Sequence, residues 1–216
     1  MVRRTKVDAL ATRNSLLDAA ELLFQAYGVS RTSLNDIAVA AGTTRGAIYW
    51  HFKDKADLFN AMMDRVALPL EESLDGAVIS DAQDPVGEIR AVLLEALRKT
   101  ALDEQTRRVF EVATHKVEYV EQMKVVQQRH LRVRNQWLAR TREAMERAVT
   151  LRREKLPIAV ATAALGLHAL VNGLIQNWLL DQEAFDLLAV GRATIDIYLA
   201  GFGLRHDQCA LALALW

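Results

Sequence analysis

The chain has 216 residues, of which 51% are hydrophobic, and its 27 basic side chains balance 27 acidic ones. This length suits one small and one larger domain, and no run approaches the roughly 18 uncharged apolar residues of a membrane helix. Because the first residues also lack the apolar core of a signal peptide, and Cys209 is the single cysteine, we expect a cytoplasmic protein without a membrane partner, an internal disulfide or a zinc cluster.

The whole chain is predicted to be α-helical. It contains three prolines and ten glycines, and its apolar residues return every three or four positions, which is typical of helices packed on one face. We therefore expect an all-α fold with about nine helices, and the clearest break is D-G-A-V-I-S-D-A-Q-D-P. The expected helices cover residues 7–27, a short stretch after Ser33, and residues 45–51, 55–74, 85–101, 103–113, 117–151, 158–180 and 184–202.

Local signals mark the ends of the short second and third helices. Ser33 and Asp36 form a capping box that starts the second helix. Gly42 ends it, and Thr43 or Thr44 caps the third helix.

These two helices have the spacing of a helix-turn-helix. Gly42 supplies the tight turn, and the third helix then enters the major groove of double-stranded DNA. Arg45 can donate two hydrogen bonds to O6 and N7 of guanine, and Gly46 lets the backbone approach the base edges. The sequence therefore predicts a three-helix DNA-binding domain over residues 1–55, followed by a larger helical domain over residues 56–216.

Further polar residues suit contacts to the DNA backbone. Tyr49, His51 and Lys55 offer donors for phosphates, which fix register without reading sequence. Arg3 and Arg4 belong to a basic arm that can enter the minor groove. The alternative is that Tyr49 and His51 only pack and the basic residues are only solvated. The predicted DNA-contacting set is Arg3, Arg4, Ser33, Thr44, Arg45, Gly46, Tyr49, Trp50, His51 and Lys55.

The charge distribution agrees with a nucleic-acid partner. Residues 1–55 carry eight basic and five acidic side chains, a net charge of +3 that the remaining residues offset. A second basic segment, residues 124–155, holds ten Lys or Arg against three Glu. We interpret it as the solvated face of a long helix, with contact to DNA flanks or to an acidic surface as the alternative.

The segment from Thr44 to Leu58, T-R-G-A-I-Y-W-H-F-K-D-K-A-D-L, resembles the signature of the TetR family of transcriptional repressors. The segments M-V-R-R-T-K and R-T-S-L-N-D-I-A are similar in particular to the AcrR and TtgR branch, whose members repress multidrug efflux pump genes. Weaker likeness continues in D-E-Q-T-R-R, H-K-V-E and V-N-G-L-I-Q-N-W-L-L. The resemblance implies a helical homodimer with a ligand-binding and dimerisation domain, in which the tyrosine, histidine and lysine of the signature face the DNA backbone.

The same resemblance implies the lining of a ligand cavity. The side chains at those positions are mostly apolar, with Thr114, His168 and Asn172 as polar groups that can orient a bound molecule. The branch often has an acidic residue where Asn172 stands, so the pocket is expected to prefer neutral or less cationic ligands. For each residue a plain core role remains the alternative. The implied lining is Val66, Ile89, Val92, Leu93, Ala96, Phe110, Thr114, Trp137, Thr141, His168, Val171, Asn172 and Ile175.

The last two helices are expected to form a dimer interface. Residues 158–180 are apolar nearly all round, and the apolar face of the last helix would leave an exposed patch too large for a monomer. Packing the same two helices from two chains gives a two-fold four-helix interface. The alternative is that these helices bury each other within one chain. The predicted interface residues are Trp178, Leu188, Ile195 and Leu199.

Together these features predict a repressor that needs no cofactor and is released from operator DNA by a small hydrophobic or aromatic inducer, as the resemblance implies. The chain has no G-x-S-x-G, phosphate-loop or H-E-x-x-H motif, so we expect no enzyme activity. Two alternatives remain open: a DNA-binding regulator that responds to no ligand, and a TetR-like regulator of catabolic or lipid genes. The apolar segment Q-C-A-L-A-L-A-L-W has no explanation in the sequence.

Overall fold

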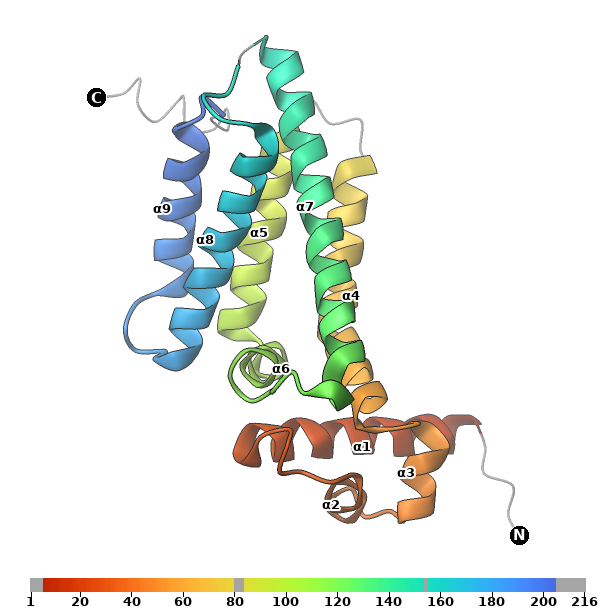
Figure 1. The fold of residues 1–216 in the computed structure, drawn as a ribbon. Coiled ribbons are helices and arrows are strands. Elements are labelled where there is room, and N and C mark those ends of the chain that lie inside the picture. Colours follow the sequence, from red (N-terminus) through yellow and green to blue (C-terminus); the bar gives the residue numbers. More distant parts are fainter. Residues whose placement is uncertain (1–5, 80–83, 154, 205–216) are drawn as a thin grey trace. The chain divides into compact units, whose positions relative to one another are not determined.

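The structure is a computed structural model that describes residues 6–79, 84–153 and 155–204. Within these ranges it contains nine α-helices, one 3-10 turn and no strand, which confirms the predicted all-α class (Figure 1). The helices are α1 (Lys6–Tyr27), α2 (Leu34–Ala40), α3 (Arg45–His51), α4 (Lys55–Ile79), α5 (Pro85–Leu102), α6 (Glu104–His115), α7 (Lys124–Arg152), α8 (Val160–Leu180) and α9 (Leu187–Ala200), with the 3-10 turn η1 (Glu121–Met123) before α7.

Residue contacts divide the chain into two compact units. The first unit comprises Met1–Leu68 and Gln105–Leu131, and the second comprises Pro69–Glu104 and Arg132–Trp216. Helices α4, α6 and α7 each contribute residues to both units. The functional division at residue 55 remains a prediction.

The first unit is built around the apolar face of α1. Leu16, Leu17 and Phe24 on this face are completely buried, and the ring of Phe24 lies 6.2 Å from the ring of Phe59 on α4. Helices α2 and α3 pack against α1 and against each other, with Ile48 as the buried anchor of α3 (Figure 1). Each such side chain contributes about 1.5–3 kcal/mol on full burial, so this core holds the two short helices in place.

Local hydrogen bonds set the ends of α2 and α3 as the sequence predicts. The Asp36 amide donates to the Ser33 hydroxyl at 3.2 Å, and the Ser33 amide donates to the Asp36 carboxylate at 2.9 Å, which completes the capping box. Gly42 follows α2 with a φ of 66°, a conformation that favours glycine. The Thr44 hydroxyl caps α3 by accepting from the Ala47 amide at 3.2 Å.

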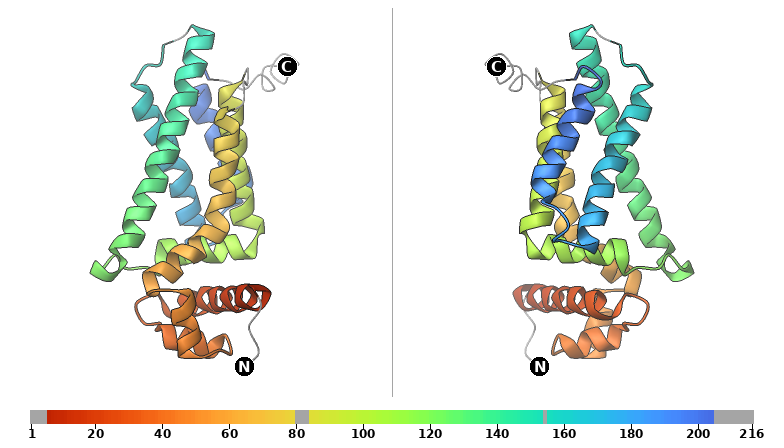
Figure 2. Two further views of the ribbon diagram at one scale, coloured as in Figure 1. Left: turned by 90° about the vertical axis from the view of Figure 1, so that its right-hand side faces the viewer. Right: turned by 90° about the vertical axis from the view of Figure 1, so that its left-hand side faces the viewer.

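In the second unit, α5, α8 and α9 pack side by side (Figure 2). Gly191 lets α9 approach α5 closely, because a Cβ at this position would lie 2.3 Å from Leu97 Cδ1. The Tyr198 hydroxyl donates to the Ala163 carbonyl at 2.9 Å and joins α9 to α8. These contacts order the helices on which most of the expected ligand-contacting residues lie.

One predicted helix begins later than expected. The sequence predicts a helix over residues 117–151, whereas α7 begins at Lys124. The carbonyl of Lys116 accepts a hydrogen bond from the Val29 amide at 3.0 Å, so this part of the chain is held by the loop after α1 instead of by a continuing helix. This contact between distant segments has no signal in local periodicity.

The fourth helix is longer than expected. It continues to Ile79, where the sequence suggested an end near residue 74. The single glycine in the predicted break costs a helix only about 1 kcal/mol relative to alanine, which is too little to end it.

Candidate DNA-binding surface and ligand site

Helix α3 is fixed to the first unit by its inward residues. Ile48 is completely buried, and Phe52 directly after the helix is buried as well. The Arg13 guanidinium of α1 lies 5.1 Å from the centre of the Phe52 ring, which is within cation–π range. The opposite face of α3 is therefore presented to solvent in a defined orientation.

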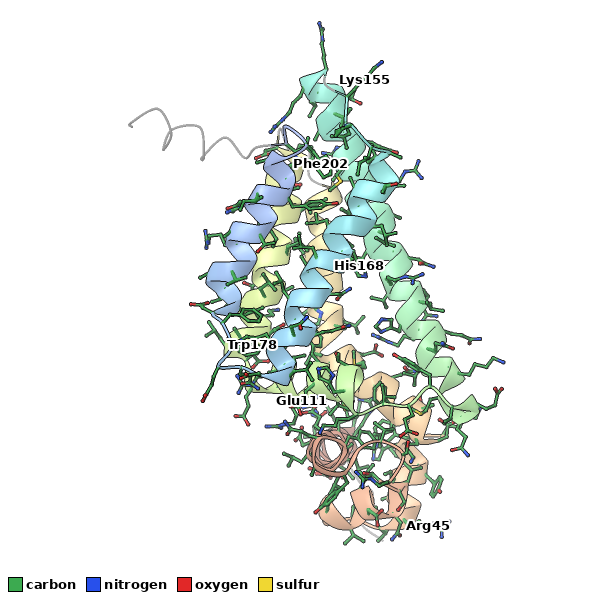
Figure 3. All side chains as sticks on the ribbon, turned by 60° about the vertical axis from the view of Figure 1, so that its left-hand side comes forward. Arg45, Glu111, Lys155, His168, Trp178 and Phe202 are labelled. Atoms are coloured by element: carbon green, nitrogen blue, oxygen red, sulfur yellow. The ribbon has the colours of Figure 1, made fainter. Side chains whose placement is uncertain are left out.

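That outer face carries Arg45, Tyr49 and Trp50. Tyr49 is 49% and Trp50 73% exposed, and Figure 3 shows Arg45 at the surface on α3. The Arg45 guanidinium lies 5.7 Å from the centre of the Tyr49 ring. Tyr49 is thus not a core residue. His51 is half-buried, and its ring lies edge-on to Trp50 with centroids 4.6 Å apart.

Gly46 has no steric reason within the chain to be glycine. Its backbone does not adopt a positive φ, and the nearest atom to an added Cβ would be the Thr44 hydroxyl oxygen at 3.9 Å. An alanine would favour the helix by about 1 kcal/mol. The missing side chain leaves open space on the exposed side of α3, where a close partner can approach.

Ser33 and Thr44, both in the predicted DNA-contacting set, have structural roles in the described chain. Each hydroxyl accepts the capping hydrogen bond of a helix, and the Ser33 hydroxyl also donates to Asp36 at 2.7 Å. This hydrogen bond and the one from the Ser33 amide lower the pKa of the Asp36 carboxyl. Both residues are exposed, so a further contact to DNA stays a prediction.

Lys55 has a role that the sequence did not indicate. Its ammonium donates to the Val29 carbonyl at 2.8 Å and lies 3.3 Å from the Ser30 carbonyl. It thereby joins the start of α4 to the turn between α1 and α2, and partial burial lowers its pKa. An ammonium has three donors, so one remains for the phosphate that the sequence predicts. Arg3 and Arg4, like the C-terminal segment with Cys209, lie outside the described residues.

Three residues expected at the ligand site form one cluster in the second unit. The Asn172 amide donates to His168 Nε2 at 2.7 Å, one helical turn along α8. The ring of His168, which is labelled in Figure 3, lies 4.9 Å from the Trp137 ring of α7. An imidazole, an amide and an indole thus meet in one place, a combination that suits a flat ligand with a few polar atoms.

Thr141 lies one turn after Trp137 on the same face of α7. Its hydroxyl is completely buried and has no hydrogen-bond partner among the described residues. A buried hydroxyl without a partner costs about 1–3 kcal/mol. A polar atom of a bound molecule would remove this cost.

The other residues of the implied lining belong to both units. In the second unit, Ile89, Leu93 and Val171 are buried, while Val92, Ala96 and Ile175 are half-buried. Val66, Phe110 and Thr114 belong to the first unit. There Val66 is buried and Phe110 packs against the apolar core, while Thr114 is half-buried.

The face assigned to the dimer interface requires a correction. Ile195 and Leu199 were expected to be exposed in a monomer, but both are buried within the single chain, as is Trp178, and Leu188 is half-buried. They pack inside the second unit because α9 contacts both α5 and α8. The exposed apolar side chains of these two helices are instead Leu165, Leu180, Val190 and Ile197.

Sequence reasoning missed a buried charge in the first unit. Glu21 of α1 is 1% exposed. Its carboxylate accepts from Gln105 Nε2 at 3.0 Å and from Arg65 at 3.2 Å, and Arg108 lies 3.8 Å away. Burial raises the pKa of Glu21. The partners are more than 40 residues away in the sequence, so no local pattern reveals them.

The first unit also has a surface cavity of about 390 Å³ that the sequence did not predict. It lies between the turn after α1 and the segment after α6, which are far apart in the sequence. Its lining residues are Ala26, Tyr27, Gly28, Ser30, Arg31, His115, Lys116, Val117 and Glu118.

Two other features, a metal-binding cluster and a membrane-spanning helix, are absent from the described part of the chain. In residues 6–79, 84–153 and 155–204, no group of three His, Cys, Asp or Glu side chains could hold a metal ion. None of the helices described there is long and apolar enough to span a bilayer.

Comparison with known proteins gives the family. A model described as "Bacterial regulatory proteins, tetR family" matches residues 16–62, and one described as "MAATS-type transcriptional repressor, C-terminal region" matches residues 84–203. The chain belongs to the TetR family of transcriptional regulators. This TetR family chain is 37% identical over 204 residues to the HTH-type transcriptional regulator AcrR of Shigella flexneri, which covers 92% of the chain and 93% of AcrR.

Two solved structures are similar along most of this TetR family chain. NalD, the secondary repressor of the MexAB-OprM multidrug efflux pump in Pseudomonas aeruginosa, has 33% identity and a TM-score of 0.81, covering 91% of this chain and 98% of NalD. SmeT of Stenotrophomonas maltophilia in complex with triclosan has 33% identity and a TM-score of 0.78, covering 88% of this chain and 90% of SmeT.

Proposed function

We propose that this protein is a ligand-responsive repressor that controls the operon of a multidrug efflux pump. The observation that carries the proposal is the exposed face of α3, where Arg45, Gly46 and Tyr49 stand on a rigidly anchored helix. The relatives support the regulated target, since NalD and SmeT are described as repressors of multidrug efflux pumps. The protein acts by binding, with no enzyme activity and no cofactor.

In this proposal α3 reads double-stranded operator DNA. Arg45 donates to a guanine edge, and Gly46 gives the backbone room to approach the bases. Tyr49, Trp50, His51 and the free donor of Lys55 face the DNA backbone. The remaining members of the contact set are Arg3, Arg4, Ser33 and Thr44. Residues 1–55 thus form the DNA-binding domain.

A small hydrophobic or aromatic inducer would bind in the domain over residues 56–216. His168 and Asn172 orient it, Trp137 stacks on it, and the Thr141 hydroxyl gains a partner. The apolar side chains of the predicted lining supply the hydrophobic contacts. Triclosan, which is present in the SmeT complex, is an aromatic molecule of this chemical class.

Two copies of the chain would bind one palindromic operator. A homodimer presents two recognition helices about one DNA turn apart, so that each reads one half-site. The exposed apolar side chains of α8 and α9 give such a dimer its contact surface. Inducer binding would favour another helix arrangement, change the spacing of the two recognition helices and release the DNA.

The proposal is tested by titrating labelled promoter DNA from upstream of the protein's own gene with the full chain. The titration is repeated with triclosan, hydrophobic antibiotics, dyes and flavonoids. We expect tight binding that at least one compound relieves. Arg45→Ala should lose discrimination of about 1–3 kcal/mol at one base pair of each half-site. Equal binding to promoter and unrelated DNA by the wild type would contradict the proposal.

A further inference from the structure

The side chain of Glu21 is the point where three helices of the first unit meet. The carboxylate belongs to α1, the Arg65 guanidinium to α4, and the Gln105 amide and Arg108 guanidinium to α6. Two donors lie within hydrogen-bond distance of the same oxygen, at 3.0 and 3.2 Å. One buried acidic group of α1 is therefore held by donors from two other helices, α4 and α6.

Stability alone does not account for this carboxylate. Removing a charge from water costs several kcal/mol, and well-packed apolar residues of similar volume often serve a fold as well or better. The neighbouring positions of α1 are filled by such residues, including Leu17, Ala20 and Phe24. Burial is also the largest influence on the pKa of Glu21, and it disfavours the charged form. The carboxylate instead adds a directional contact. Its oxygen accepts a hydrogen bond from Gln105, and this bond fixes where α6 lies along α1.

Two further hydrogen bonds join the second half of α1 and the turn after it to α6 and the residue after it. Gln25 donates to Glu111 at 2.7 Å, and the Val29 amide donates to the Lys116 carbonyl at 3.0 Å. Glu21, Gln25 and Val29 are four residues apart, and their partners advance along the α6 segment in the same direction, from Gln105 to Lys116. Figure 3 places Glu111 on α6. We call this row of polar contacts the α1–α6 seam.

We propose that Glu21 is a positioning residue that couples α6 to α1, so that a displacement of α6 moves the DNA-binding helices instead of being absorbed between them. The inference rests on the proposed function in one respect: Phe110 and Thr114, which are expected to contact the inducer, lie on α6 between the ends of the seam. A ligand that moves them moves the seam. Since α2 and α3 pack on α1, a movement of α1 changes their position as well.

The test compares Glu21→Gln with Asp18→Asn in the full-length protein. Both changes remove a carboxylate of α1 that pairs with Arg65, but Asp18 is mainly exposed and its described ion pair is with α4 alone, at 2.7 Å. Glu21→Gln should fold, because Arg65 keeps Asp18 and Arg108 keeps other interactions. Gln105→Met serves as a second variant, since it removes the α6 donor and leaves the carboxylate paired.

Hydrogen–deuterium exchange of the protein without ligand or DNA measures the coupling directly. In Glu21→Gln and Gln105→Met, amides in the second half of α1 should exchange at least about tenfold faster than in the wild type, while Asp18→Asn should stay within about twofold. Wild-type exchange in both seam variants, or equal acceleration in Asp18→Asn, would overturn the proposal.

Release of promoter DNA by triclosan measures its consequence. If triclosan weakens wild-type binding by about 5- to 150-fold, the factor in Glu21→Gln should fall to less than a third of the wild-type value, with Asp18→Asn unchanged. An unchanged factor in Glu21→Gln would overturn the inference. If triclosan and the rest of the panel fail to release the wild type, the ligand-responsive function fails, and the exchange comparison still decides whether Glu21 couples the two helices.

Discussion

At the scale of single residues, the glycine on α3 separates a folding role from a binding role. Gly46 shows no positive φ, and apart from its chain neighbours and the backbone of α3, the nearest described atom to an added Cβ is the Thr44 hydroxyl oxygen at 3.9 Å. The described chain therefore gives no steric reason for a glycine instead of an alanine at this position. The one surface it leaves open is the surface that the proposal assigns to DNA.

Gly46→Ala is expected to raise the free energy of unfolding by about 0.5–1 kcal/mol, because alanine favours a helix more than glycine. Promoter affinity should nevertheless fall at least tenfold, since the added methyl group meets the base edges. Denaturant unfolding and DNA titration of the same preparation check both effects. A stabilised variant with unchanged DNA affinity would remove Gly46 from the proposed contact surface.

The pH dependence of stability expected from Glu21 is opposite to that of a carboxyl group whose pKa falls on folding. Burial raises its pKa above the ordinary value of 4.5, against the opposing effects of Gln105, Arg65 and Arg108, and Asp18 raises it further. A carboxyl whose pKa is raised on folding favours the folded state below its unfolded pKa. That contribution is lost as the pH rises through the folded pKa.

The free energy of unfolding of Glu21→Gln, relative to the wild type, should therefore increase as the pH rises above the ordinary carboxyl pKa of 4.5. Urea unfolding at several pH values measures the difference. A relative decrease over this range would mean that the ion pairs outweigh the cost of burial.

At the scale of elements, Lys55 joins the start of α4 to the turn after α1. The two carbonyls that its ammonium contacts belong to Val29 and Ser30, and the Val29 amide donates to the carbonyl of Lys116, directly after α6. This short turn is thus tied to both helices by hydrogen bonds. Lys55 has a role in folding in addition to its expected contact with phosphate.

Lys55→Met keeps the aliphatic stem but loses these hydrogen bonds. We expect a fall of about 1.5–3 kcal/mol in the free energy of unfolding, the usual worth of a hydrogen bond to a charged group. The slope of log affinity against log salt should also decrease by about one, because one phosphate contact is lost. An unchanged slope would show that Lys55 acts on the fold alone.

The elements also show what the sequence can and cannot predict. The bounds of α3 agree with the prediction of residues 45–51, because Thr44, Gly42 and the capping box act within a few residues. The predicted start of α7 was wrong because the Val29 amide forms a hydrogen bond with the distant Lys116 carbonyl. Long-range pairs of this kind depend on packing, which periodicity does not contain.

The predicted sites follow the same rule. The exposure of Arg45 and Tyr49 follows from the spacing of apolar residues on a short helix, and the pairing of His168 with Asn172 follows from their separation of four positions. The prediction of which side of α9 faces solvent in a single chain was wrong. A helix that is apolar on most sides does not reveal which of its faces the rest of its own chain covers. Glu21 was missed because its partners come from α4 and α6.

At the scale of the whole molecule, the proposed dimer depends on which side chains α8 and α9 leave exposed. Ile197 is 73% exposed, whereas Leu199, two residues further, is 2% exposed. The two positions therefore separate association from folding. In the proposed dimer, a charge at Ile197 would lie at the contact surface, whereas a charge at Leu199 would lie in the core of the single chain.

Ile197→Asp should yield monomers by light scattering with a melting temperature within a few degrees of the wild type, and its promoter affinity should fall because one half-site is lost. Leu199→Asp should instead lower the free energy of unfolding by several kcal/mol, since it buries an unpaired charge. A stable dimer of Ile197→Asp would place the interface on another surface.

In the proposed function, the inducer and operator DNA bind the same protein, and each weakens the binding of the other. The most direct test is a closed binding cycle with the most effective compound of the panel: promoter affinity with and without the compound, and compound affinity with and without promoter DNA. Because linkage is reciprocal, we predict that both affinities fall by the same factor, between about 5 and 150. Tight binding of both partners with a factor of one in each direction would contradict a ligand-responsive repressor and leave a DNA-binding protein that responds to no ligand.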